Sequence, residues 1–202
     1  MMNLGLQKLL VKDSEAISLL RSSKVGVMPT DTVYGLVARA DNPAAAARLY
    51  ALKHREHKPG TIIAANIQQL VDLGIEPRHL DRIAHLWPNS LSVVVPAGEH
   101  LAYLHQDLRS IPMRIPKDPK FRRILEQTGA LISSSANQPG MPPAANAAQA
   151  WDYFQGSVDF YVAGEDLTGK APSTIICVSE NGHIEVLRQG AVTLTAEDLT
   201  PA

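Results

Sequence analysis

The sequence has one cysteine and almost no excess of charge, and both shortages exclude classes of protein. Cys177 is the only cysteine among the 202 residues, so no disulfide can form within the chain. Its apolar neighbours indicate a small buried side chain. The 19 Lys and Arg residues against 20 Asp and Glu residues leave a formal charge of -1. The chain therefore lacks the broad basic field of a non-specific nucleic-acid binder. We therefore expect a reducing compartment, the cytoplasm.

Long hydrophobic runs are missing as well. No stretch approaches the roughly 18 consecutive apolar residues that a membrane-spanning helix needs, and the first residues lack the basic and apolar regions of a secretory signal. No internal repeat or long linker divides the chain. Its 202 residues and 45% hydrophobic composition are enough for one substantial core. We expect no membrane contact and a single domain over residues 1–202, with its core roughly at 13–192.

Short strand-like and helix-like runs alternate along the chain. Strands are predicted at 25–28, 61–65, 91–95, 111–115, 130–133, 158–162, 174–178 and 184–187. Helices are predicted at 44–53, 67–73, 78–86, 119–127 and 144–154, with a first helix capped by residue 13 or 14. Asn42 and Pro43 have the residue types of an N-cap and a first helical position. The pattern predicts an α/β or α+β domain with one large twisted sheet.

Polar residues crowd at the ends of predicted strands in four places, where ligand sites often form. The four segments are 29–36, 53–60, 133–140 and 171–176, with residues 188–190 one strand further on. Each has a simpler explanation by itself: a capped turn, cations at a helix end, a polar turn, or hydroxyls that bond within the sheet. Four such segments together favour a site.

The basic segment and the serine-rich segment suit phosphate binding. Lys53 and Arg55 can neutralise phosphates, the arginine by a bidentate grip and the lysine as a point charge. Small hydroxyl and amide side chains such as Ser135 and Asn137 let a loop approach an anion closely. No glycine-rich phosphate loop is present, and the histidines in the basic segment lack the companions of a metal site.

The order and wording of these segments resemble the YrdC-type threonylcarbamoyl-AMP synthases. The fragments that carry the resemblance are Pro29-Thr30-Asp31-Thr32-Val33-Tyr34-Gly35-Leu36, Lys53-x-Arg55, Arg114-Ile115-Pro116, Ser135-Ala136-Asn137, Pro172-Ser173-Thr174-Ile175 and Leu187-Arg188-Gln189-Gly190. They run in the family's order from residue 29 to residue 190. The chain resembles the single-domain form, because it is too short for the additional C-terminal domain of the two-domain members.

The resemblance implies a large twisted mixed sheet flanked by helices, with an open cleft, and a nucleotidyltransferase activity. The enzyme would form threonylcarbamoyl-AMP and pyrophosphate from L-threonine, bicarbonate and ATP, normally with Mg²⁺, for the N6-threonylcarbamoyladenosine modification of tRNA. The residues that the resemblance assigns to ATP are Lys53, Arg55, Ser135, Asn137 and Arg188, with Lys53 and Arg55 as the catalytic pair. Those that it assigns to threonine are Thr32, Tyr34, Arg114, Ser133 and Ser173. No metal ligand is identified.

The implied partners also include downstream threonylcarbamoyl-transfer proteins and a contact with tRNA or double-stranded RNA. Three places depart from the family's usual pattern: Asp31 replaces the common Glu, Glu56 replaces a proline in a segment one residue short, and Asn89-Ser90 replaces Gly-Pro. Two alternatives stay open. One is a related protein with another carbamoyl or adenylyl transfer activity. The other is an RNA-binding module, whose affinity would fall steeply with salt.

Overall fold

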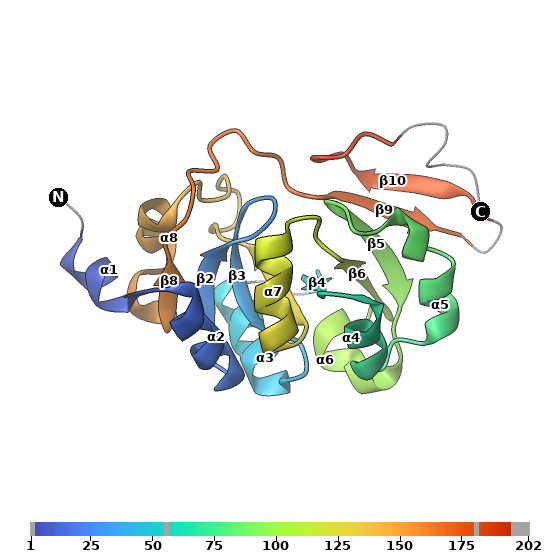
Figure 1. Cartoon of the computed structure of the whole chain (residues 1–202), viewed down its shortest axis with the longest axis horizontal. Helices are drawn as coiled ribbons and strands as arrows, with labels where there is room; N and C mark the ends of the chain where they lie inside the picture. The colour runs from blue at the N-terminus through green and yellow to red at the C-terminus, as the bar shows by residue number, and fades with distance from the viewer. Residues whose placement is uncertain (1–2, 55–56, 180–181, 195–202) are drawn as a thin grey trace.

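The computed structural model describes residues 3–54, 57–179 and 182–194, and its strands form one mixed sheet (Figure 1). The strand order is β1-β8-β2-β3-β7-β4-β6-β5-β9-β10. Parallel and antiparallel neighbours both occur, as the predicted fold class requires. The strands are β1 (Leu10–Val11), β2 (Gly26–Pro29), β3 (Tyr34–Arg39), β4 (Thr61–Ile63), β5 (Leu91–Pro96), β6 (Ser110–Arg114), β7 (Leu131–Ser135), β8 (Phe160–Val162), β9 (Thr174–Val178) and β10 (Ile184–Arg188).

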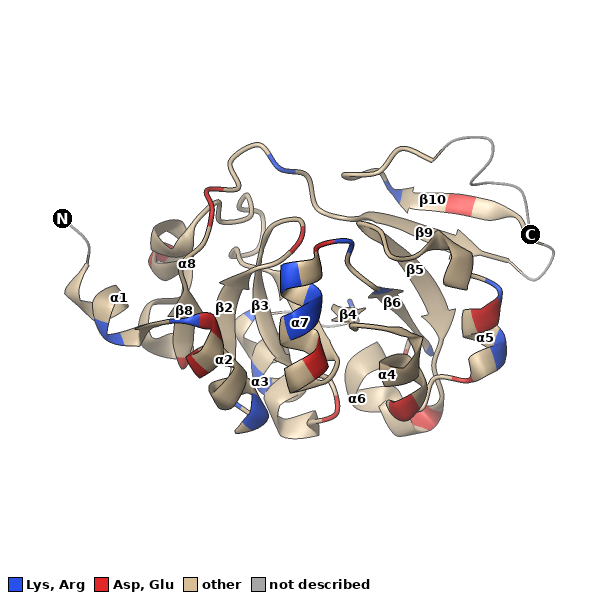
Figure 2. Cartoon of the chain, viewed as in Figure 1, with Lys and Arg blue, Asp and Glu red and all other residues tan. Residues whose placement is uncertain are grey.

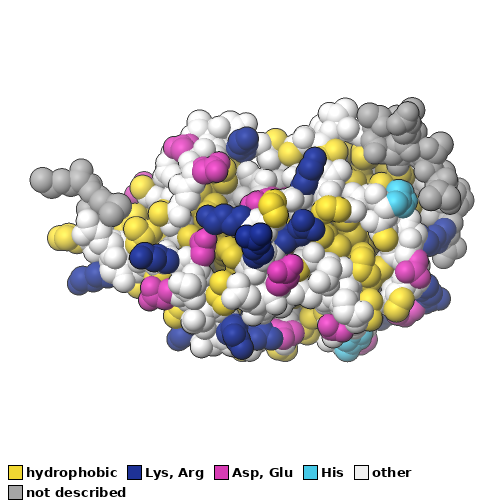
Figure 3. Space-filling model, in the orientation of Figure 1, with side chains coloured by type: hydrophobic (Ala, Val, Ile, Leu, Met, Phe, Trp, Pro, Cys, Tyr) yellow, Lys and Arg dark blue, Asp and Glu magenta, His cyan; other side chains and the backbone are white. Residues whose placement is uncertain are grey.

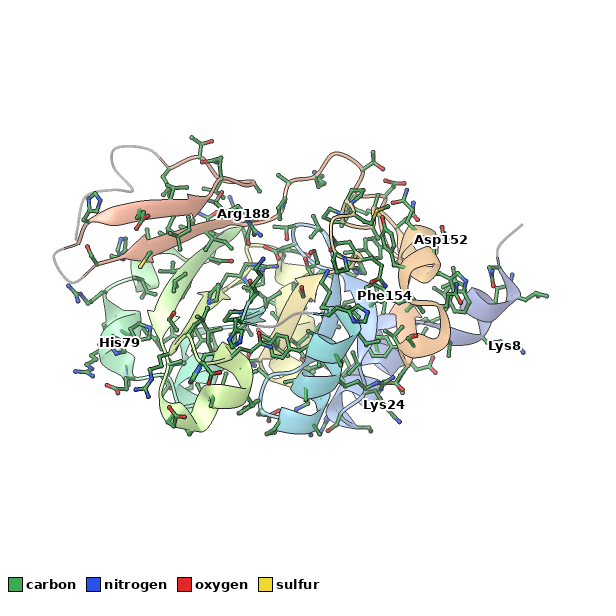
Figure 4. All side chains as sticks on the ribbon, turned by 180° about the vertical axis from the view of Figure 1, so that it is seen from behind. Lys8, Lys24, His79, Asp152, Phe154 and Arg188 are labelled. Atoms are coloured by element: carbon green, nitrogen blue, oxygen red, sulfur yellow. The ribbon has the colours of Figure 1, made fainter. Side chains whose placement is uncertain are left out.

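Helices cover both faces of the sheet. On the face turned to the viewer in Figure 1, which we call the front face, lie α2 (Asp13–Arg21) and α7 (Pro119–Thr128). Behind the sheet lie α3 (Pro43–Leu52), α6 (Ala102–His105) and α8 (Ala147–Phe154), as the reverse view shows (Figure 4). The remaining helices and 3-10 turns are α1 (Leu4–Leu9), α4 (Ile67–Asp72), α5 (Pro77–Asp81), Ala84–Leu86, Glu99–Leu101 and Gln155–Ser157.

The central strands are buried on both faces, and their alternate residues belong to two different cores. On β3, Leu36 packs in the larger core with α3 and α8, whereas Val37 packs with α2 and α7. On β7, Ile132 and Leu131 divide in the same way. Successive side chains of a strand point to opposite faces, so continuous apolar runs are what a sheet between two helix layers needs. The predicted strands are apolar for this reason.

The helix α3 begins with a side-chain cap and a proline that fix its first turn, whereas α2 does not. The Asn42 side chain accepts a hydrogen bond from Ala45 N over 2.9 Å, and Pro43 occupies the first turn of α3. The prediction of an N-cap at Asn42 is therefore confirmed. The predicted cap of the first helix at residue 13 or 14 is wrong, because α2 begins at Asp13 and Lys12 precedes it with no capping side chain.

Several parts of the fold differ from the sequence prediction. The elements α1, β1 and α6 were not predicted, and Cys177, expected to be buried, is half-buried. Residues 34–39 form β3, although no strand was predicted there from the sequence. The hydroxyls and the glycine of the motif interrupt the apolar pattern by which a strand is predicted, yet β3 pairs with β2 on one side and with β7 on the other. The helix predicted at 78–86 is broken, because α5 ends at Asp81 and a separate 3-10 turn follows at Ala84–Leu86.

Candidate active site

Along three neighbouring strands of the front face, apolar residues give way to small and polar ones. The pairs are Leu131 and Ser133 on β7, Val37 and Gly35 on β3, and Ile63 and Thr61 on β4. Residues two apart on a strand share a face. The apolar member of each pair packs against α7 in the core, and the other member lines a cavity of about 210 Å³. The cavity therefore lies where the helical cover of the front face ends.

Two glycines make room around Ser133. A Cβ atom on Gly35 would lie 2.7 Å from Ser133 Oγ, and one on Gly60 would lie 2.7 Å from Ser133 O. Both distances are too short for real Cβ contacts. Gly35 in the first motif is thus required for the close approach of β3 to the serine-rich strand β7. Packing, and not the conformation of a turn, explains the glycine.

Arg114, at the end of β6, reaches the turn between β2 and β3. Its Nε and Nη2 donate to Asp31 Oδ1 over 3.1 and 2.7 Å, and the two side chains are 5% and 3% exposed. Asp31 Oδ2 in turn accepts from Ser90 Oγ over 3.2 Å. Asp31 and Ser90, both singled out in the sequence as departures from the pattern that the chain resembles, are thus in contact.

Lys53, the C-cap residue of α3, lies beneath the segment that follows β7. Its Nζ donates to Ser135 O, Asn137 O and Asn137 Oδ1 over 2.8, 2.6 and 2.8 Å. Ser135 Oγ donates to Asn137 Oδ1 over 2.6 Å. An ammonium group has three N–H donors, so these acceptors match its full capacity. The lysine, serine and asparagine predicted to bind ATP thus form one bonded cluster.

Ser173 and Arg188 meet at the other side of the cavity. Arg188 donates to Ser173 O through Nε and Nη2 over 3.2 and 2.7 Å. Ser173 Oγ lies 2.9 Å from the buried Ser92 Oγ. A Cβ atom on Gly190 would lie 2.2 Å from Pro172 O, so this glycine, two residues after Arg188, lets the segment after β10 pass close to the segment before β9.

Tyr34 stands behind the cavity rather than in its wall. Its side chain is fully buried, and its hydroxyl accepts a hydrogen bond from Gly164 N over 2.8 Å. Burial is the main cause that raises the pKa of Tyr34 above its usual range. The tyrosine therefore ties the loop after β8 to the first motif. Although it was predicted to contact threonine, Tyr34 does not line the cavity.

The predicted site residues are mostly brought together. Six of them line the cavity: Thr32, Arg114, Ser133, Ser135, Ser173 and Arg188. Lys53 and Asn137 are bonded to Ser135 directly behind this wall. Arg55 lies outside the described residues. Four prolines of the wall had been given no role from the sequence: Pro59, Pro112, Pro143 and Pro172. The only signal for them was their place within or near the polar segments.

Basic side chains gather around the cavity on the front face. Figure 2 shows Lys and Arg on α7, on the loop between β8 and β9, and at the end of β10, and Figure 3 shows dark blue groups near the centre of this face. Lys120 and Lys170 line an adjoining hollow of about 340 Å³, which shares Thr30 and Thr32 with the cavity, but Asp13, Asp31, Asp118 and Glu165 line this hollow as well. The charged side chains that line the cavity itself are those of Arg114 and Arg188, and these two cations favour an anionic ligand there despite the net charge of -1.

The described residues contain no group of three or more His, Cys, Asp or Glu side chains arranged to hold a metal ion. Among the helices of the described segments, none has the length and apolar character needed to cross a membrane.

Comparisons with known proteins agree with the fold and the motifs. The model of the Sua5/YciO/YrdC family, described as "Telomere recombination", matches residues 18–190. A threonylcarbamoyl-AMP synthase of Pseudoalteromonas translucida (strain TAC 125) is 32% identical over 176 residues, which are 84% of this chain and 94% of that protein. A threonylcarbamoyl-AMP synthase of Chromohalobacter salexigens is 36% identical over 140 residues, 67% of this chain and 76% of that protein.

Solved structures share the same architecture. The Sua5 protein of P. abyssi, complexed with L-threonine, superposes with a TM-score of 0.78 at 25% identity, over 90% of this chain and 57% of that chain. This chain therefore spans less than two thirds of the length of that Sua5 protein. E. coli YciO has a TM-score of 0.75 at 21% identity over 90% of this chain and 93% of its own, a likeness of fold.

Proposed function

Because this chain belongs to the Sua5/YciO/YrdC family, we propose that its cleft makes threonylcarbamoyl-AMP and pyrophosphate from L-threonine, bicarbonate and ATP. The observation that carries the proposal is that Lys53, Ser135 and Asn137 form one cluster at the cavity that also contains Arg114. A phosphate-binding group and a carboxylate-binding group thus share one hollow. The enzyme is a nucleotidyltransferase in this proposal.

Threonine would occupy the side of the cavity formed by β6, β7 and the turn after β2. Arg114 is the partner for the α-carboxylate, because a guanidinium group suits paired hydrogen bonds to a carboxylate. The hydroxyls of Thr32, Ser133 and Ser173 line the same hollow and offer donors and acceptors for the amino acid. Tyr34 supports this wall from behind through its bond to Gly164.

ATP would lie along the segment after β7 and toward β10. Ser135 and Asn137 would hold phosphates and ribose, and Arg188 would close on the nucleotide from the opposite side. Lys53 would act through its charge and by holding the segment in place, since its N–H groups already donate to Ser135 and Asn137. Arg55 would supply the direct grip on the phosphates that its residue type suits.

The chemistry needs positioned charge and no side-chain nucleophile. Threonine nitrogen and bicarbonate first form a carbamate, with loss of water. A carbamate oxygen then attacks the α-phosphorus of ATP, and the bond to the β-phosphate oxygen breaks to release pyrophosphate. Fixed cations and donors near the phosphates stabilise the charge that grows in the transition state. Mg²⁺ would arrive bound to the triphosphate, because magnesium sites of this kind take most of their ligands from phosphates and water.

The product would pass to a second protein that transfers the threonylcarbamoyl group to tRNA in the cytoplasm. The basic groups on the front face (Figure 3) are also where an RNA backbone would bind, and such binding would weaken steeply with salt. RNA contact is thus a second candidate property of this face, in addition to the synthase activity.

The test is to incubate the purified protein with ATP, threonine and bicarbonate and to measure pyrophosphate and the adenylated product. We expect pyrophosphate release that requires both threonine and bicarbonate, with threonylcarbamoyl-AMP in equal amount. Release that is independent of threonine would assign a different substrate. No release, together with salt-sensitive binding of RNA, would replace the synthase by an RNA-binding module.

A further inference from the structure

Asp31 and Arg114 form an ion pair that is almost closed to solvent in the wall of the site. The side chains are 3% and 5% exposed. Both hydrogen bonds of the pair end on Asp31 Oδ1, which accepts from Arg114 Nε over 3.1 Å and from Nη2 over 2.7 Å. The second carboxylate oxygen accepts from Ser90 Oγ over 3.2 Å. The aspartate is therefore held from two sides, by β6 and by the residue that precedes β5.

The pair turns one edge of the guanidinium group away from the cavity and leaves another edge open. Nε and Nη2 are directed to Asp31, and the hydroxyls of Thr30 and Thr32 lie 3.5 Å from Nη2. Nη1 has no hydrogen-bond partner among the described residues, and Arg114 lines the cavity. Asp31 lines the adjoining hollow instead. The aspartate thus lies behind the arginine and is not part of the cavity lining.

We infer that Asp31, steadied by Ser90, is a positioning residue that presents the Nη1 edge of Arg114 to the carboxylate of threonine. The inference rests on the proposed function. An arginine side chain without a fixed partner must be ordered when the ligand binds, and such ordering weakens affinity. With Asp31 in place, this ordering is complete in the free protein, so the carboxylate meets a guanidinium group of fixed orientation.

Simple electrostatics predicts the opposite result, which makes the inference testable. Replacing Asp31 by Asn removes a negative charge next to Arg114, and by charge alone this change would tighten the binding of a carboxylate. Positioning predicts weaker binding. The variant D31N keeps the size of the side chain, and S90A removes only the bond to Asp31 Oδ2.

The experiment measures threonine binding by calorimetry for wild type, D31N and S90A, with threoninol, which lacks the carboxylate, as the comparison ligand. We expect Kd for threonine to rise about tenfold in D31N and about threefold in S90A. The ratio of Kd for threoninol to Kd for threonine should also fall, more in D31N than in S90A. The KM for ATP in the synthase assay should stay within about twofold, because Asp31 does not touch the nucleotide side.

The matched control is D41N. Asp41 pairs with Arg39 at the far end of β3, where the two side chains are 51% and 28% exposed, so its loss should leave threonine binding unchanged. Unchanged or tighter threonine binding by folded D31N overturns the inference. If thermal melting shows that D31N does not fold, S90A decides: weaker threonine binding supports the inference, and wild-type binding overturns it. A wild-type protein that binds no threonine would overturn the proposed function, and with it this inference.

Discussion

Leu131 and Ser133 lie two residues apart on β7 and face the same side of the sheet, yet they belong to different regions. Leu131 is fully buried beneath α7, and Ser133 lines the cavity. The neighbouring strands repeat the change from Val37 to Gly35 and from Ile63 to Thr61. The backbone is the same regular sheet in both regions, so the difference lies in whether a helix covers the face.

This comparison shows how one sheet serves both stability and binding. In the covered region, apolar side chains are removed from water, at roughly 25 cal/mol for each Å² of apolar surface. In the uncovered region, hydroxyls and a guanidinium group remain available to a ligand, and their bonds to one another fix their places. Substitutions in the covered region should therefore lower stability and leave ligand binding intact, and substitutions in the uncovered region should do the reverse.

The largest expected effect is in the covered region. Leu131→Ala removes a fully buried side chain, and such changes cost about 2 to 5 kcal/mol in the free energy of unfolding. The cost should appear in urea denaturation, whereas kcat/KM for each folded molecule should remain within about twofold of wild type. A large loss of specific activity in a folded L131A protein would show that the two regions are not separable.

A smaller effect in energy is expected at Lys53, on the side of the site that holds ATP. Lys53→Met keeps the apolar stem and removes the three bonds to Ser135 and Asn137. We expect kcat/KM to fall about 100-fold, equivalent to about 2.7 kcal/mol. The exposed Lys58 of the same segment provides the matched control, and Lys58→Met should retain wild-type rates. Equal rates in both variants would remove Lys53 from the site.

The smallest effect is expected at Ser133 itself. Ser133→Ala removes one hydroxyl from the cavity wall, and Kd for threonine should rise about tenfold, equivalent to about 1.4 kcal/mol. The free energy of unfolding should change by less than about 1 kcal/mol, since the substitution removes a single oxygen atom from a side chain that no helix covers. Leu131→Ala should therefore lower stability and spare binding, and Ser133→Ala should do the reverse. A change in the free energy of unfolding of Ser133→Ala that exceeds its change in the free energy of threonine binding would contradict a binding role for Ser133.

The sequence predicted most strands and named residues that the fold brings together around one cavity, because both depend on short local patterns. The run from Thr174 to Val178 is a strand with the predicted bounds. The strand from Tyr34 to Arg39 was missed, because its first residues belong to a polar motif and a glycine interrupts its apolar pattern. Its partners on β2 and β7 make it a strand, and pairing with β7 depends on residues far along the chain.

The contacts of the charged residues were beyond prediction for the same reason. Lys53 and Arg114 were both expected to face ligands, and each is found bonded to protein oxygens more than 80 positions away in the sequence. Their residue types indicated phosphate and carboxylate binding, but only the fold reveals which N–H groups are already used. The positioning role that we infer for Asp31 follows from such a contact, because the first motif places the residue near the site but does not show what it bonds to.

The most direct test of the account is a crystal structure of the chain with threonine and a non-hydrolysable ATP analogue. The account predicts the threonine carboxylate within hydrogen-bond distance of Arg114 Nη1, and the phosphates beside Ser135 and Asn137. Binding of both ligands away from the uncovered part of the front face would contradict it.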